Sequence, residues 1–302
     1  MSEARHYQTL GRGLDHRLPP MILWRKAKKL GIWDPADIDF TQDAKDWQAL
    51  SDLEREVLLH LTCLFQAGEE SVTVDLLPLI MTMADEGRLE EEMYLTSFLW
   101  EEAKHVEAFH RFLSEVVGDD AGDLTRFETP SYNQIFNEAL PQALQRLRED
   151  RSPIAQAEAS VTYNMIVEGV LAETGYHAYH QMLTDNGILP GMQKVVGHLK
   201  GDESRHMAYG VFLLSRLVAE HGDEVWSAIE QRMGMLLGPA TGVINELFAT
   251  YDELPFGLDL GVFTQYAMGQ FQKRFTRIER ARNQTLDEVL KQTDDLSVAA
   301  AG

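Results

Sequence analysis

The chain has 302 residues, of which 44% are hydrophobic and 25% are charged, the composition of an ordinary folded protein. Its formal net charge of −21 argues against nucleic acid as a partner, because phosphate binding requires a basic surface. The single cysteine, Cys63, excludes an internal disulfide framework and is typical of a reducing compartment. No run reaches the ~20 apolar residues of a membrane span, and no signal-peptide pattern opens the chain, so we expect a cytoplasmic protein without a stable membrane span.

The first third of the chain predicts two long helices after a short basic one. Residues 1–18 are polar and contain glycine, which predicts a poorly ordered segment. A basic amphipathic helix is expected at 21–31, and a surface helix is favoured there over a membrane-contacting one. The first long helix is expected over 52–86, with a kink at Pro78 because proline removes a backbone hydrogen bond. The second is expected over 88–117.

The remaining chain continues the helical pattern. Further helices are expected over 131–149, 153–185, 192–221, 223–251 and 259–281, with Gly238-Pro239 breaking or bending the fourth of them. The polar, then Ala-rich tail at 283–302 predicts disorder. Neither strand alternation nor a βαβ pattern is found, and helices of this length pack side by side in bundles. We therefore predict one all-α domain over 1–302, with the helical bundle at 45–281.

Two Glu-x-x-His motifs provide the strongest functional signal. Glu102 and His105 lie on the helix expected over 88–117, and Glu203 and His206 lie on the helix expected over 192–221. Residues i and i+3 of an α-helix lie one turn apart on the same side, so each motif directs a carboxylate and an imidazole to one point. Both motifs fall inside apolar stripes, where a carboxylate is costly unless it is paired or holds a metal.

Single glutamates on two other helices complete a dinuclear metal site. Such a site in a bundle uses one Glu from each of two helices and a Glu-x-x-His from each of two others. Glu69 is preferred to Glu70 because it lies in the apolar stripe of its helix, and Glu168 is preferred to Glu173 for the same reason. The predicted metal ligands are Glu69, Glu102, His105, Glu168, Glu203 and His206.

The chemistry of this ligand set indicates the metal and the reaction class. Four carboxylates and two imidazoles without a thiolate favour iron or manganese over structural zinc or copper(I). Four carboxylate charges also neutralise two divalent cations, which makes their burial tolerable. Two adjacent metals that change oxidation state can each give an electron to O₂, so O₂ activation is expected and hydrolysis is not.

Over about residues 45–280 the chain resembles the ferritin-like di-metal carboxylate proteins, specifically the ribonucleotide reductase R2 subunit group. The sequence Glu-Glu-Ala-Lys-His at 101–105, the segment Tyr163-Asn164-x-x-Val167-Glu168-Gly169 and the motif Asp202-Glu203-x-x-His206 look most like the R2-like ligand-binding oxidases. Residues 33–40 and 188–192 are similar to the same family. The resemblance implies a ferritin-like helical bundle with a four-helix metal-binding core.

The resemblance also implies a cofactor and a ligand. It implies a mixed manganese/iron centre, with di-iron as the alternative, a bound long-chain fatty acid or similar hydrophobic ligand, and a homodimer. It further implies an O₂-dependent ether cross-link between Tyr163 and Val72. Val72 is i+3 from Glu69 and therefore faces the site. Tyr163, five residues before Glu168, points roughly 140° away on an ideal helix unless a π-bulge swings it inward.

Two further residues have open interpretations. Asp202 is either a hydrogen-bond acceptor for a ligand histidine or a solvated helix residue. Tyr176 lines the ligand cavity by resemblance, although a core tyrosine would give the same pattern.

The leading hypothesis is an oxidase that performs two-electron oxidation of a hydrophobic ligand. One alternative is a radical-generating reductase small subunit. Against that alternative, Phe109 stands where a tyrosine commonly follows the first histidine, and 283–302 contains no aromatic residue to relay a radical. The other alternative is a metal- or lipid-binding module without oxidase activity.

Overall fold

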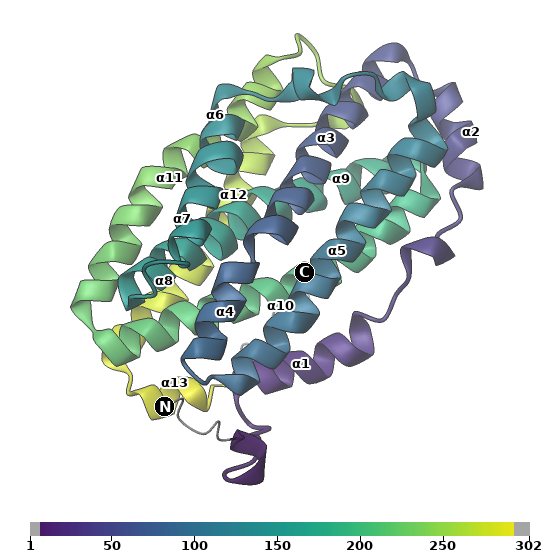
Figure 1. The fold of residues 1–302 in the computed structure, drawn as a ribbon. Coiled ribbons are helices and arrows are strands. Elements are labelled where there is room, and N and C mark those ends of the chain that lie inside the picture. Colours follow the sequence, from purple (N-terminus) through teal and green to yellow (C-terminus); the bar gives the residue numbers. More distant parts are fainter. Residues whose placement is uncertain (1–6, 293–302) are drawn as a thin grey trace.

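The computed structural model describes residues 7–292, and no residue in this range forms a strand, which confirms the all-α prediction. Four elements supply the centre of the bundle: α3 (Asp52–Asp75), α5 (Leu89–Phe112), the π-helical segment η7 (Val161–Ala172) and α10 (Pro190–His221). They pack on one another in a ferritin-like arrangement, with α3 and α5 side by side and α10 behind them (Figure 1). No helix within the described range is both long and apolar enough to cross a bilayer.

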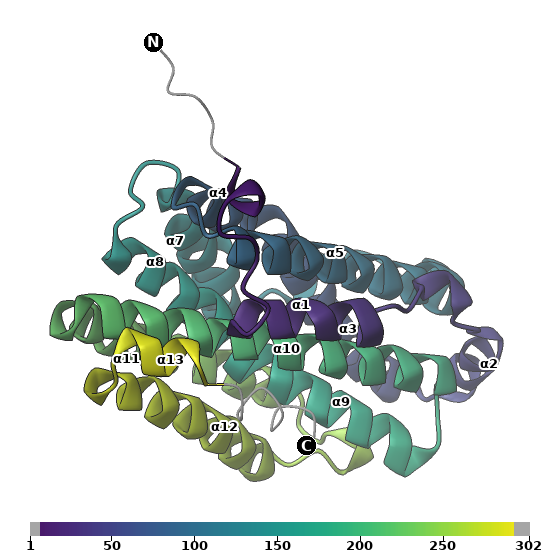
Figure 2. The same ribbon diagram turned by 90° about the horizontal axis from the view of Figure 1, so that it is seen from below.

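The other helices cover this centre. They are α1 (Pro19–Leu30), α2 (Thr41–Ala49), α4 (Leu77–Asp85), α6 (Pro130–Tyr132), α7 (Leu140–Arg146), α8 (Pro153–Ser160), α9 (Glu173–Asn186), α11 (Asp223–Ala249), α12 (Leu260–Arg280) and α13 (Leu286–Leu290). Figure 2 shows α1 lying along α5 and α10, while α11 and α12 close the opposite side. The apolar side of α1 is buried through Met21, Leu23 and Ala27, so this basic helix belongs to the core layer.

Two prolines have different consequences. A kink within one helix was expected at Pro78, and the structure instead divides this stretch into two helices, because α3 ends at Asp75 and α4 begins at Leu77. Pro239, in contrast, lies inside a continuous α11, so Gly238-Pro239 does not end that helix. A proline within a helix removes one backbone hydrogen bond, and the packing of α11 on η7 and α8 compensates for that loss.

Both terminal segments contain more structure than their composition predicts. In the segment 1–18, Gln8 Nε2 and the Asp15 amide donate to the buried Glu90 at 2.8 and 3.1 Å. In the segment 283–302, α13 begins with a capping box formed by Thr285 and Glu288. These contacts belong to the described part of each segment, while residues 1–6 and 293–302 lie outside the described residues.

Candidate metal centre

Six buried side chains from the four central elements converge in the middle of the bundle. They form two overlapping groups: Glu69, Glu102, His105 and Glu203 in one, and Glu102, Glu168, Glu203 and His206 in the other. Within each group the ligand atoms all lie within 4.8 Å of one another. Glu102 and Glu203 belong to both groups, as carboxylates that bridge two metal ions would.

The structure distinguishes the selected glutamates from their neighbours. Glu69 is 5% exposed and Glu168 is 3% exposed, so both carboxylates face the interior. Glu70 is exposed to solvent. Glu173 is turned away to pair with Arg274 of α12. The helix stripes therefore predicted which carboxylate of each candidate pair points inward.

The donor atoms fit a pair of hard cations. Glu102 Oε2, Glu168 Oε1, Glu203 Oε2 and His206 Nδ1 are buried and have no hydrogen-bond partner among the described residues. His206 Nδ1 lies 3.1 Å from Glu102 Oε1, but the pair does not have hydrogen-bond geometry. Buried polar atoms left unsatisfied are costly, so this cluster is explained by oxygen- and nitrogen-binding ions placed between the donors.

The protonation of the cluster leads to the same conclusion. Burial raises the pKa of Glu69 to about 8, and burial next to Glu203 raises the pKa of Glu168 well above its usual range. At Glu102 burial acts in the same direction, but the adjacent His206 and His105 outweigh it and lower the pKa of this carboxylate. Four buried carboxylates cannot all be ionised without compensating cations, and two divalent ions would supply them.

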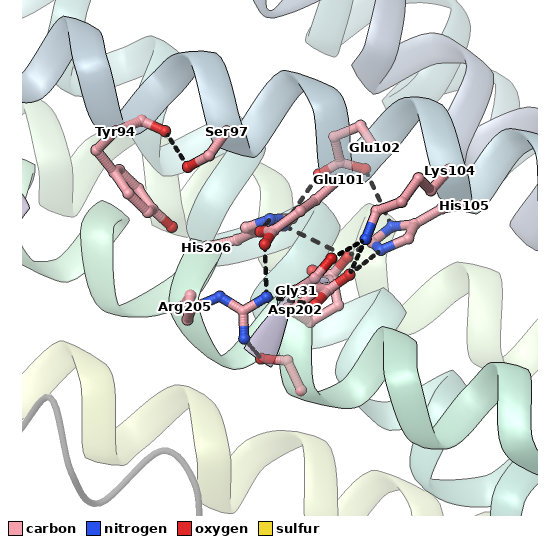
Figure 3. A network of polar contacts seen from close by, with 12 residues as sticks. Gly31, Tyr94, Ser97, Glu101, Glu102, Lys104, His105, Asp202, Arg205 and His206 are labelled. Atoms are coloured by element: carbon pink, nitrogen blue, oxygen red, sulfur yellow. Dashed lines mark hydrogen bonds and ion pairs between the residues drawn. The ribbon is translucent and has the colours of Figure 1, made fainter. Parts of the chain in front are cut away.

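The outer nitrogens of both histidines are held by carboxylates (Figure 3). His105 Nε2 lies 3.3 Å from Asp202 Oδ2, and His206 Nε2 lies 2.9 Å from Glu101 Oε2. This leaves the Nδ1 atom of each ring facing the cluster, and such partners fix the ring orientation of metal-binding histidines. Arg205 contacts both Glu101 and Asp202 and links the two carboxylates.

This arrangement decides between the two interpretations of Asp202. It is 1% exposed and accepts from Trp33 Nε1 at 2.8 Å, so it is not a solvated helix residue. Glu101 was not singled out in the sequence. The signal for it was an acidic residue immediately before each motif glutamate, which occurs at both Glu101 and Asp202.

The tyrosine at position 163 reaches the cluster because its helix is not α-helical. The segment η7 contains Tyr163 and Glu168, and its i→i+5 hydrogen bonds place residues five apart about one turn from each other. Tyr163 Oη consequently donates to Glu102 Oε1 at 3.0 Å. Tyr176, in the following helix α9, donates its hydroxyl proton to Glu69. Both hydroxyl groups therefore border the cluster.

An apolar cavity adjoins the carboxylates. Its inner end is formed by Glu69, Glu102, Glu168, Glu203 and Tyr176. Apolar side chains line the rest, among them Leu61, Leu64, Phe65, Val72, Phe136, Val167, Leu171, Val243, Ile244, Leu247 and Phe263. Val72 lies beside Gly68 and Glu69 on this wall, with 4% of its surface exposed.

Comparison with known proteins agrees with the geometry. Residues 21–252 match the family of the ribonucleotide reductase small chain. The R2-like ligand-binding oxidase from Sulfolobus acidocaldarius is 40% identical, with a TM-score of 0.86 over 94% of this chain and 98% of that chain. Two single-residue variants of an R2-like ligand-binding oxidase with reconstituted Mn/Fe cofactor, one anaerobic and one aerobic, are 38% and 37% identical. Their TM-scores are 0.86 and 0.87, and each comparison covers 92% of this chain and 100% of that chain.

The match by the family model spans most of the chain, and the solved structures are 37–40% identical to it over nearly their whole length. The chain therefore belongs to the ribonucleotide reductase small chain family, and within it to the R2-like ligand-binding oxidases.

Proposed function

We propose that the protein is an O₂-dependent oxidase with a dinuclear Mn/Fe centre that oxidises a bound hydrophobic ligand by two electrons. The observation that carries this proposal is the direct contact between a cluster of redox-suited metal donors and an apolar cavity. Glu69, Glu102, His105, Glu168, Glu203 and His206 would hold the two metals. When bound, such metals supply the electrons that reduce O₂ and the oxidising power that acts on the ligand.

The ligand is proposed to be a long-chain fatty acid or a similar amphiphile. The cavity wall is mainly apolar, and its polar groups are the carboxylates and the side chains of Tyr132, Thr174 and Tyr176. An alkyl chain is stabilised against such a wall, at roughly 25 cal/mol for each Å² removed from water. The polar headgroup of the ligand would then face the metal donors, where the hydrogen-bonding groups of the protein are concentrated.

The ligand is tested with a matched pair of variants. Val243→Phe fills the cavity from α11, a helix that supplies no metal donor, whereas Val262 is 56% exposed and lies outside the cavity. Lipid extracted from purified protein and identified by mass spectrometry should be reduced in Val243→Phe and retained in Val262→Phe. Equal lipid content in both variants would contradict this cavity as the binding site.

We also propose an ether cross-link between the hydroxyl oxygen of Tyr163 and a side-chain carbon of Val72. The reaction breaks the phenol O–H bond and one valine C–H bond, forms the C–O bond, and passes two electrons and two protons to O₂. Tyr163 is supported by its hydrogen bond to Glu102, and Val72 by its place on the cavity wall. Burial raises the pKa of the Tyr163 hydroxyl well above its usual range, so the phenol starts the reaction protonated.

Intact-mass measurement after aerobic loading with Mn(II) and Fe(II) tests the cross-link. The expected result is a loss of two hydrogens in the wild type and no loss in Tyr163→Phe. A Tyr179→Phe variant, which removes another buried hydroxyl, should behave as the wild type does. If the metal-loaded protein consumes no O₂, the oxidase proposal fails and a binding module remains. Co-purification with a large catalytic subunit would instead favour a radical-generating reductase subunit.

A homodimer is the proposed assembly, as the family resemblance implies. Light scattering of the metal-loaded protein should give twice the mass of the 34.2 kDa chain.

A further inference from the structure

A row of aromatic rings leads away from the metal donor His206, and none of its residues lines the apolar cavity. The His206 and Phe98 rings are stacked with their centroids 3.6 Å apart and their planes 17° apart. Phe98 is followed by Tyr94 at 6.0 Å, and Tyr94 by Tyr209 at 5.2 Å. Phe212 lies 6.2 Å beyond Tyr209 and lines a surface groove between α10 and α12. Figure 3 shows Tyr94 on the same side of the cluster as His206.

The two tyrosines of this row differ in what their hydroxyl groups contact. Tyr94 Oη is buried and has no hydrogen-bond partner among the described residues. Tyr209 Oη donates to Glu91 Oε2 at 3.0 Å, and this carboxylate is also 3.2 Å from Arg216 Nε. A phenol that loses an electron becomes a strong acid, so it forms a stable neutral radical only where a base can take its proton. Only Tyr209 of this pair has such a base.

We propose that Tyr209 is a redox site that gives an electron, through Tyr94 and Phe98, to the oxidised metal centre when no ligand is there to be oxidised. The inference rests on the proposed oxidase function, which supplies the oxidant. In this step the Tyr209 O–H bond breaks, the proton moves to the Glu91 carboxylate, and one electron reduces the centre, leaving a tyrosyl radical. A reductant of the thiol or ascorbate class restores the phenol from the groove that Phe212 lines.

This path gives surplus oxidising power an exit that avoids the cavity. Once the Tyr163–Val72 cross-link has formed, a centre that reacts with O₂ again in the absence of ligand would oxidise further side chains near the metals if it had no such exit. The row ends at Phe212 in a surface groove, where a reductant reaches the end of the row without entering the apolar cavity, although Glu203 and Tyr176 also line this groove. Residues 283–302 contain no aromatic side chain, and the row through Tyr209 supplies the exit that this tail cannot.

A second tyrosine path provides the matched control. Tyr179 is linked to the cluster by Phe65, whose ring lies 5.7 Å from Tyr179 and 4.6 Å from Tyr176. Its hydroxyl oxygen is 3.1 Å from the hydroxyl oxygen of Thr62, a neutral partner that cannot hold a second proton as a carboxylate can. Tyr179 is thus a buried tyrosine that aromatic rings also connect to the cluster, but its hydroxyl group has no base beside it, so it should not hold a radical.

The experiment is electron paramagnetic resonance on protein frozen after aerobic loading with Mn(II) and Fe(II), without added fatty acid. All samples carry Tyr163→Phe, so that the cross-link cannot consume the oxidising equivalents. O₂ uptake is measured on the same samples, and ring-deuterated tyrosine identifies tyrosyl signals by their narrowing. We expect a tyrosyl signal in the Tyr163→Phe protein and when Tyr179→Phe is added to it, loss of the signal when Tyr209→Phe is added, and a lower yield when Tyr94→Phe is added. Added ascorbate should remove the signal.

Results that differ from these expectations contradict electron transfer from Tyr209 to the metal centre. An undiminished signal after addition of Tyr209→Phe, or O₂ uptake with no tyrosyl signal in any of these proteins, rejects Tyr209 as the redox site and leaves the oxidase function in place. An absence of O₂ uptake rejects the oxidase function and the relay with it. If Tyr209→Phe fails to fold, Tyr94→Phe decides, because it removes only an unpartnered hydroxyl, and an undiminished signal there rejects the path.

Discussion

The Nε2 atom of His206 lies 2.9 Å from the carboxylate of Glu101, a residue that belongs to the other Glu-x-x-His helix. The relationship is reciprocal, because His105 of α5 is held in the same way by Asp202 of α10. Each motif therefore orients the imidazole of its partner motif. This crossing couples the two helices at the metal site, and it explains why an acidic residue precedes both motif glutamates.

Loss of this support should weaken metal binding. Glu101→Gln keeps the shape of the side chain but removes the negative charge that holds the His206 ring and increases its basicity. The expected result is a decrease of roughly 10–100-fold in metal affinity, the usual effect of changing a partner of a ligand histidine. A competition titration against a metal-binding dye measures it. Glu107→Gln, an exposed change on the same helix, is the control and should leave the affinity unchanged.

The sequence was sufficient for the fold class and for the orientation of the six predicted donors. Apolar stripes on long helices carry that information, because a charged side chain inside such a stripe must face the interior. The placement of Tyr163 could not be derived in this way, since the switch from i→i+4 to i→i+5 hydrogen bonding over 161–172 follows from tertiary packing. Asn164 illustrates this, because it fits against Gly210 of α10 and donates to Glu168 at 2.8 Å.

The close approach of Gly210 to η7 leads to a second prediction. A Cβ atom at Gly210 would lie 2.2 Å from Asn164 Cβ, so Gly210→Ala must push the π-helical segment and α10 apart. Such overpacking typically costs about 1–3 kcal/mol in the free energy of unfolding. Denaturant unfolding of the metal-free protein measures this loss, and weaker metal binding should accompany it because Glu168 moves with η7.

The same helix offers a matched control for this substitution. Gly201 also lies within α10, but a Cβ atom there would meet nothing within 4 Å. Gly201→Ala is therefore expected to raise the free energy of unfolding by roughly 0.5–1 kcal/mol, because glycine is a poor helix former. If both alanines had the same effect, the Gly210–Asn164 contact would not be what positions η7.

His60 should make the stability of the fold depend on pH. Its ring is buried against Phe127, with Nδ1 3.0 Å from the Tyr251 hydroxyl oxygen, and burial lowers its pKa from 6.5 to about 4. Between these values the unfolded chain binds a proton that the folded protein does not. The stabilising contribution is therefore complete above pH 6.5 and is lost as the pH falls toward 4, by up to about 3 kcal/mol.

A His60→Gln variant isolates this contribution from that of the acidic residues. Glutamine keeps a polar group near Tyr251 but does not titrate. The difference in the free energy of unfolding between wild type and variant, measured by denaturation at several pH values, should shrink as the pH is lowered from 6.5 to 4. A difference that is constant across this range would show that His60 is protonated equally in the folded and unfolded protein.

Metal removal should lower the Tm of the wild type much more than the Tm of a Glu168→Gln variant. Bound metal stabilises the fold by about 2.7 kcal/mol at a free concentration of 100 Kd, so chelation should lower the Tm of the wild type by several degrees.

In the metal-free Glu168→Gln variant the Tm should be unchanged or higher. Burial beside Glu203 already disfavours the charged form of Glu168, and glutamine is neutral. The glutamine oxygen can still accept from Asn164. Adding Mn(II) and Fe(II) should then raise the Tm of the variant much less than that of the wild type. Glu70→Gln, on the exposed side of α3, should match the wild type in both states, as seen by differential scanning calorimetry. A variant that loses stability without metal yet keeps the full metal-induced increase would place Glu168 in a structural role and remove it from the metal donors.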